Sequence, residues 1–164
     1  MDITLEQSLA SAVRFIQDND IEGVKPYFDE LPEQFYVPSI YFPVPNTYSD
    51  QVSLMSYKTT IAVMCWFCEK TDWEANARAA SVRDALLLNG SVVPVISKDG
   101  EQVGKGFHIE RPELRRIDEG IIQLTFQLKD YFTPGSEGVE KIQNIYLIWH
   151  RVVSELTGGE AYGN

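Results

Sequence analysis

Cys65 and Cys68 form a Cys-x-x-Cys pair, the spacing that redox centres and zinc sites use. A redox pair needs its first thiol at a helix N-terminus, where the helix dipole lowers the thiol pKa. Here positions 53–69 are rich in β-branched and aromatic residues and predict a strand, on which residues three apart point to opposite faces. A zinc site would need His108 and His150 as further ligands, and they fall on another predicted strand and on the predicted last helix. We therefore interpret the cysteines as core residues; a metal-binding regulator is the alternative, and elemental analysis for zinc would test it.

The run Asp18-Asn19-Asp20-Ile21-Glu22-Gly23 resembles the start of a calcium-binding loop that follows a helix. Such a loop has a bidentate Glu at its twelfth position and a hydrophobic residue at its eighth, where this chain has Asp29 and Lys25. A second helix should follow, but a proline-rich stretch stands there instead. Turn residues that stop a helix explain the same sequence, so we expect no calcium site.

No catalytic motif is recognisable: the sequence has no GxSxG, no P-loop and no GxGxxG. The run Gly104-Lys105-Gly106 lacks the loop that a phosphate needs and is interpreted as a bulge or bend in a strand. We therefore expect a protein that is not an enzyme and has no cofactor. The alternative is a small ligand-binding or enzymatic α+β domain with its site between the sheet and the last helix. A pocket with converging polar groups and a shifted pKa would favour that alternative.

Composition and charge narrow the class of protein further. The chain has 164 residues, of which 44% are hydrophobic and 12% aromatic, enough for one packed domain, which we place at 1–157 with a flexible tail at 158–164. The net charge of −10 argues against nucleic acid as the main ligand. No apolar stretch approaches the roughly 20 residues of a membrane span, and the acidic start is unlike a signal peptide. We expect a protein that is made in the cytosol and binds no membrane.

Hydrophobic periodicity and turn residues predict three helices and four strands. The expected helices cover about 5–18, the stretch from the Thr71/Glu74 capping box to Asn89-Gly90, and 136–157 with Ser136 as N-cap. The expected strands are 53–69, 91–97, 104–117 (broken near Pro112) and 121–131, with turns at 98–100 and 118–120. The predicted fold class is α+β: a mostly antiparallel sheet of about four strands packed against two or three helices.

Positions 26–50 form an arm rich in proline and aromatic residues. The four prolines between positions 32 and 45 exclude a central strand, so we expect an extended arm with one short edge strand over 39–42. Its aromatic side chains either pack on their own domain or cover a neighbouring subunit, since interfaces are enriched in such residues. These interface candidates are Tyr36, Tyr41, Phe42 and Tyr48. The polar front half of the long strand, 53–60, looks like a sheet edge available to a partner.

Arg111, Arg115 and Arg116 form a local basic cluster in an acidic chain. They belong either to a solvated face or to a docking patch for an acidic partner, and we include them among the interface candidates.

The strand ending Trp66-Phe67-Cys68-Glu69-Lys70-Thr71 runs into Asp72-Trp73-Glu74-Ala75-Asn76-Ala77-Arg78-Ala79-Ala80-Ser81-Val82-Arg83-Asp84-Ala85-Leu86. This unit resembles the tail terminator (tail completion) proteins of bacteriophages and phage-tail-like particles, as does the later stretch 106–132 with Ile121-Ile122-Gln123-Leu124-Thr125-Phe126-Gln127-Leu128. The resemblance covers about residues 5–132.

The resemblance implies a homo-hexameric ring, assembled in the host cytoplasm and located at the tail or neck of the virion. Its partners would be the tail tube protein, the neck or connector proteins and, in a contractile tail, the sheath protein. DNA would only pass through the lumen, and no catalytic residues are carried over. A head–tail joining protein, which also forms rings, is the nearest alternative.

Overall fold

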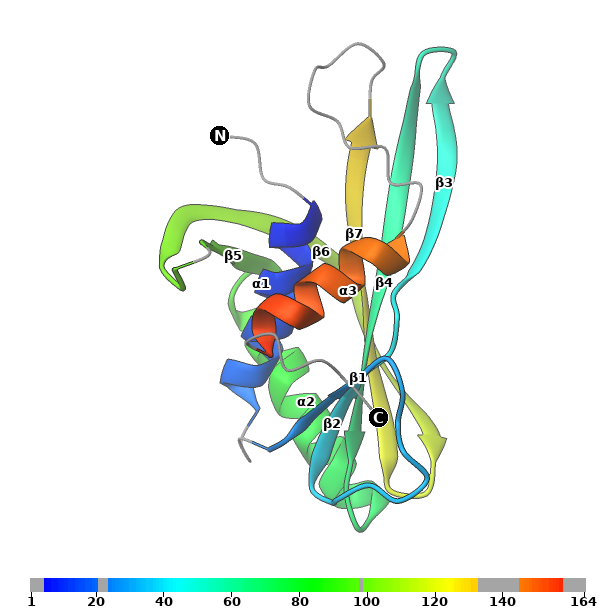
Figure 1. Cartoon of the computed structure of the whole chain (residues 1–164), viewed down its shortest axis with the longest axis vertical. Helices are drawn as coiled ribbons and strands as arrows, with labels where there is room; N and C mark the ends of the chain where they lie inside the picture. The colour runs from blue at the N-terminus through cyan, green and yellow to red at the C-terminus, as the bar shows by residue number, and fades with distance from the viewer. Residues whose placement is uncertain (1–4, 21–23, 98, 133–144, 158–164) are drawn as a thin grey trace.

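The computed structural model describes residues 5–20, 24–97, 99–132 and 145–157, and within these ranges the chain has three helices and seven strands (Figure 1). The helices are α1 (Leu5–Asn19), α2 (Asp72–Leu88) and α3 (Ile145–Leu156). The strands are β1 (Pro26–Phe28), β2 (Ser39–Phe42), β3 (Asn46–Ser53), β4 (Ser56–Cys68), β5 (Val92–Ile96), β6 (Gln102–Asp118) and β7 (Ile121–Phe132).

One curled sheet contains all seven strands, in the order β1-β2-β4-β7-β6-β5, with β3 paired to β4 beside β2. The β1–β2 pair is parallel and the other pairs are antiparallel. The α+β class is therefore confirmed, but the expected number of strands was too low. The arm supplies β2, which was predicted, together with β1 and most of β3, which were not.

The prolines of the arm explain this difference, because they bracket its strands instead of interrupting them. Pro26 is the first residue of β1, Pro38 precedes β2, and Pro43 and Pro45 separate β2 from β3. These are positions where a missing N–H costs no internal ladder bond. The predicted short strand has the predicted bounds, but it is not at an edge: β2 lies between β1 and β4.

The two central strands, β4 and β7, pair without interruption from Tyr57↔Phe132 to Cys68↔Ile121. Strand alternation directs one set of side chains of each strand towards the helices, where they are buried. These core residues are Ile61, Val63, Cys65 and Phe67 on β4 and Ile122, Leu124, Phe126 and Leu128 on β7. Burying side chains of this size stabilises a fold by roughly 1.5–3 kcal/mol each, so this double row is the main support of the helical layer.

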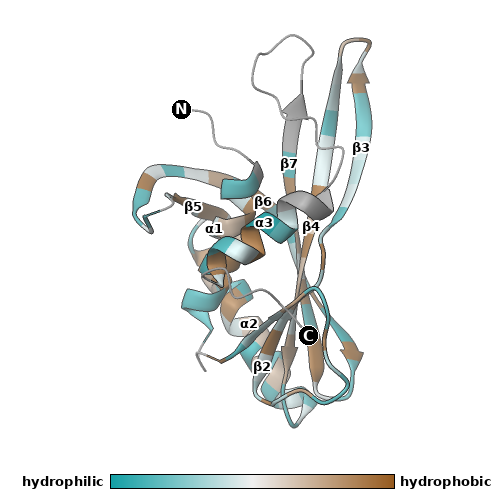
Figure 2. Cartoon of the chain, in the orientation of Figure 1, coloured by the Kyte–Doolittle hydropathy of each residue, from teal (hydrophilic) through white to brown (hydrophobic). Residues whose placement is uncertain are grey.

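The three helices lie on the same side of the sheet (Figure 1), and hydrophobic residues are concentrated where the helices meet the sheet (Figure 2). Ala75 and Ala79 of α2 are fully buried, and their small side chains allow close packing of this helix. Leu9 of α1 is also fully buried. On α3, Trp149 is fully buried and its ring lies 6.4 Å from that of Phe28. In the described part of the chain, no helix has the length and apolar character required to cross a membrane.

The predicted caps and turns are present where the structure describes them. Thr71 caps α2: its Oγ1 accepts a hydrogen bond from the Glu74 N–H at 3.3 Å and donates one to Glu74 Oε2 at 3.1 Å. The two predicted hairpins join β5 to β6 and β6 to β7, and the predicted break near Pro112 is a bulge with Arg111 at φ 52°. The predicted start of the last helix at Ser136, the predicted tail at 158–164 and Lys98 lie outside the described residues.

Candidate assembly interface

Arg78 is a charged residue of α2, yet its side chain is buried. Its Nε and Nη2 donate to the two carboxylate oxygens of Asp20 at 3.0 and 2.6 Å, and its Nη1 donates to Glu69 Oε1 at 2.8 Å. The same Nη1 reaches the backbone oxygens of Ser39 at 3.2 Å and Cys68 at 3.4 Å. The cluster joins the end of α1, the end of β4 and the start of β2, and its groups satisfy one another, which indicates a structural role.

The calcium-like run is used by this cluster. Both carboxylate oxygens of Asp20 are held by Arg78, and the side chain is 2% exposed, so it faces inward rather than towards a loop. Asp29 has a positive φ of 61°, and its main-chain oxygen accepts a hydrogen bond from the Tyr41 hydroxyl at 2.7 Å. Glu22 and Gly23 lie outside the described residues.

Cys65 and Cys68 are both buried on β4 and are not joined to each other. Burial raises the pKa of the Cys68 thiol and raises that of Cys65 well above its ordinary value, which disfavours the reactive thiolate at neutral pH. His108 on β6 and His150 on α3 are exposed. Among the described residues, no group of three or more His, Cys, Asp or Glu side chains is placed to hold a metal ion.

The aromatic interface candidates divide into two pairs. Phe42 is fully buried and stacks on Phe28 at 5.3 Å, and Tyr41 is 8% exposed with its ring edge on Trp66 at 5.1 Å. For these two, packing on their own domain is the alternative that holds, because the arm is part of the sheet. Tyr36 and Tyr48 are 75% and 47% exposed and remain interface candidates.

The three arginines of the predicted basic cluster are exposed but do not share one face. Arg115 is opposite Gln123 and Arg116 is opposite the buried Ile122, so successive residues of β6 point to opposite sides of the sheet. Arg116 lies on the helix side, and its Nε donates to Asp72 Oδ2 at 2.7 Å. A single docking patch made of all three arginines is therefore not formed within one copy of the chain.

The β3–β4 hairpin extends past the helical layer as a long ribbon beside the end of β7 (Figure 1). Its tip carries exposed apolar residues that the sequence analysis did not single out: Val52, Leu54 and Met55, with Leu54 at 96% exposure. Hydrophobic colour appears at this tip in Figure 2, away from the core. The expectation that 53–60 is an open edge is wrong, because β4 is paired with β3 on one side and β7 on the other. In the part of the chain that the structure describes, the open edge belongs to β3.

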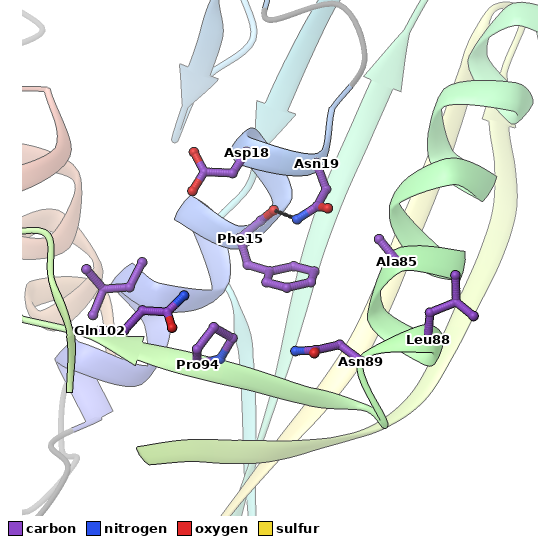
Figure 3. A pocket seen from close by; sticks show the side chains of 9 residues that line it. Phe15, Asp18, Asn19, Ala85, Leu88, Asn89, Pro94 and Gln102 are labelled. Atoms are coloured by element: carbon purple, nitrogen blue, oxygen red, sulfur yellow. Dashed lines mark hydrogen bonds between the residues drawn. The ribbon is translucent and has the colours of Figure 1, made fainter. Parts of the chain in front are cut away.

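A groove of about 520 Å³ lies between α1, α2 and the β5–β6 hairpin (Figure 3), whereas the ligand-binding alternative places its site between the sheet and the last helix. Asp18 is the one titratable side chain among its nine lining residues. The Asn19 amide in the groove donates to the Phe15 backbone oxygen at 2.8 Å. The groove thus lacks the set of acid–base groups that catalysis would require.

Comparison with known proteins gives two partial matches, whereas no family model matches the chain. The chain is 29% identical over 94 residues to the phage-like element PBSX protein XkdJ of Bacillus subtilis strain 168, a match that covers 57% of this chain and 64% of XkdJ. It is 26% identical over 96 residues to YqbJ of the same bacterium, described only as uncharacterized, across 58% of this chain and 66% of YqbJ.

Both matches cover slightly less than two thirds of the relative's own length. The chain is therefore similar to a protein of a phage-like element, which agrees with the coarser expectation of a relation to phage proteins. The similarity does not distinguish a tail terminator from other proteins of such an element.

Proposed function

We propose that this protein is a structural component of a phage or phage-like tail that forms a ring at the head-proximal end. The ring, a homo-hexamer, terminates growth of the tail tube and docks to the neck or connector proteins. The observation that carries the proposal is the similarity to the PBSX protein over 94 residues. The resemblance of the β4–α2 unit and of β7 to tail terminators supplies the finer assignment.

The shape of the molecule supports an assembly role. The helices cover one side of the sheet, and the β3–β4–β7 ribbon projects beyond them with an apolar tip (Figure 1). Exposed apolar residues on a projecting hairpin are typical of binding surfaces, because a partner that covers them removes apolar surface from water.

The charge of the chain agrees with a ring through which DNA passes. A net charge of −10 for each copy gives a negative surface, which repels phosphates and lets DNA move without being retained. The proposed location is the tail or neck of the particle, with assembly in the host cytoplasm, and the proposed partners include no membrane. The sheath protein is a further partner if the tail is contractile.

The first test measures the mass of the purified chain by light scattering and images any oligomer by negative stain, alone and with purified tail tubes. A six-fold ring, formed alone or on the tubes, is the expected result. A chain that stays monomeric and ignores tubes at every concentration contradicts the proposal. A ring of another copy number that binds only neck proteins favours the head–tail joining alternative.

A second test deletes the corresponding gene from the phage or element that encodes the chain and images the particles. Loss of a terminator removes the stop on tube growth, so we expect tubes of irregular, excessive length without heads. Tails of normal, uniform length that merely lack heads would instead indicate a joining protein.

A further inference from the structure

The sheet has three strands at its margins, β1, β5 and β3, and two of them are protected against pairing with another chain. The three-residue strand β1 begins with Pro26. Strand β5 contains Pro94, and the Ile96 N–H donates to Ser11 Oγ of α1 at 3.0 Å. Proline and a covering helix are the usual means of blocking a sheet edge.

Within the described residues, strand β3 has neither a proline nor a covering helix. Its eight residues, Asn46–Ser53, include no proline, lysine or arginine. The six consecutive residues from Tyr48 to Ser53 are all exposed. Among the described residues, β3 pairs only with β4, so its outer row of N–H and C=O groups has no strand partner. An unprotected edge of this length is a template for a further strand.

A second unpaired edge lies on the other side of the same ribbon. Strand β6 leaves β7 after the pair Ile109↔Leu128 and turns to β5, so in the described chain residues 129–132 have only β4 as a neighbour. The two edges are at the same level: Thr60 pairs with Tyr48 on one side and Lys129 on the other. A three-stranded ribbon open on both sides can accept a further strand at each edge.

Charge selects what that neighbour can be. Positions 39–57 contain one charged residue, Asp50, which lies 3.9 Å from Lys58, whereas 23% of the whole chain is charged. Copies that each carry a charge of −10 repel one another, so they can meet closely only through their neutral surface. A basic partner such as a nucleic-acid-binding segment would be drawn to the acidic surface elsewhere. The β3 side of the ribbon, with Asp50 as its one charge, therefore fits a second copy of this chain, whose 129–132 edge carries two charges of opposite sign, Lys129 and Asp130.

We infer that β3 of one copy pairs with β7, at residues 129–132, of the next copy, and that the hairpin tip packs against the same neighbour. Both strands are antiparallel to β4, so they run in the same direction and the new pair is parallel. The contact joins two different surfaces, and a contact of this kind closes into a ring when its rotation permits. The inference rests on the proposed ring and assigns the surfaces that build it.

The tip is tested with the substitutions Leu54→Asp and Leu88→Asp. Leu54 is 96% exposed on the hairpin and Leu88 is 89% exposed at the end of α2, so the two variants make the same change at similar exposure in different places. We expect Leu54→Asp to weaken association at least tenfold by light scattering and Leu88→Asp to leave it unchanged. Both variants should keep the wild-type melting temperature. Equal association by both variants would overturn the assignment of the tip.

The strand edge is tested by replacing Tyr48 with the photo-crosslinking residue p-benzoylphenylalanine in the assembled ring. The expected product joins position 48 of one copy to a peptide that contains residues 129–132 of another. A product that joins position 48 to position 48 would indicate a two-fold contact and overturn the inference, as would crosslinks to the tube protein alone.

The two proposals fail in different ways. A wild-type chain that forms no ring, with or without tubes, contradicts the proposed function itself. A six-fold ring that tolerates Leu54→Asp and gives no crosslink to residues 129–132 leaves the proposed function in place and overturns only this interface.

Discussion

Arg78 holds three separate parts of the chain through one guanidinium. Burial disfavours its charge, but the hydrogen bonds and ion pairs with Asp20 and Glu69 outweigh burial and raise the pKa of Arg78. The side chain is 4% exposed and also lies over the Phe67 ring at 5.4 Å. Removing it would leave two acidic groups in the interior with no counter-ion, which is costlier than losing the pair as a whole.

We therefore expect Arg78→Met to lower the free energy of unfolding by about 3–5 kcal/mol, measured by urea denaturation. The control is Arg83→Met on the same helix, where the arginine pairs with Asp84 at 2.9 Å on the surface. That surface pair is expected to contribute at most about 1 kcal/mol. Similar losses in the two variants would show that the buried cluster is not a main support of the fold.

Asp72 couples the start of α2 to the β6–β7 turn. Its Oδ1 accepts from the Gly120 N–H at 2.6 Å and its Oδ2 from Arg116 Nε at 2.7 Å. These hydrogen bonds lower the pKa of the Asp72 carboxyl below its ordinary value of 3.8. A carboxyl whose pKa is lower in the folded state stabilises the fold above its unfolded pKa and loses that effect as the pH falls through the folded pKa.

The expected result is a stability difference between wild type and Asp72→Asn that is largest near neutral pH. It should decrease as the pH falls below 3.8 and the wild-type carboxylate becomes protonated. Urea denaturation of both proteins over a pH series measures this difference. A difference that is independent of pH would mean that the carboxylate charge is not involved.

At the scale of elements, the β6–β7 turn is set by close backbone approach. Gly120 has φ +72°, and a Cβ there would lie 2.3 Å from the backbone oxygen of Glu69. Gly90, after α2, has a similar φ of +68°, but a Cβ there would meet nothing within 4 Å. The two glycines therefore separate backbone strain from a steric clash.

We expect Gly90→Ala to cost about 1–2 kcal/mol, which is the penalty of the left-handed conformation alone. Gly120→Ala should cost clearly more, because the clash is with backbone and cannot be relieved by a side-chain rotation. Thermal and urea unfolding of the two variants measure the difference. Equal costs would show that the turn can move away from Glu69.

The elements that could be predicted are those with local signals. α2 has its Thr71 cap and periodic apolar residues, and β7 alternates cleanly, so both were predicted within one or two residues. Two strands of the arm, β1 and β3, were missed because their pairing depends on residues farther along the chain: Pro26 is opposite Ile40, and Asn46 is opposite Ala62. Prolines between short strands and prolines in an irregular segment give the same local pattern.

The candidate interface was only partly predictable for the same reason. Whether Phe42 is buried or Tyr36 is exposed depends on which elements pack against the arm. That packing cannot be read from the local sequence. Arg78 was not singled out because it is charged, although it is at a buried helical position. The apolar residues of the tip, Val52, Leu54 and Met55, gave a local signal: they interrupt a polar stretch.

For the whole molecule, charge predicts how the proposed ring responds to salt. Copies with a charge of −10 repel, and added salt screens this repulsion over a Debye length of about 10 Å at 0.1 M. If copies meet through the ribbon, association should strengthen as NaCl is raised from about 0.05 M to about 0.5 M. Sedimentation velocity measures the shift. Weaker association at high salt would instead indicate a contact made by opposite charges, such as the exposed arginines of β6.

The pairing of β4 with β7 also fixes the order in which the chain can mature during synthesis. The partners Cys68 and Ile121 are 53 positions apart and Tyr57 and Phe132 are 75 apart, from the register Cys68↔Ile121 and Tyr57↔Phe132. Closing loops of this length before the contacts form slows folding. During synthesis the apolar side of β4 therefore remains uncovered until β7 has left the ribosome. In this interval the nascent chain is most prone to aggregation and to binding by chaperones.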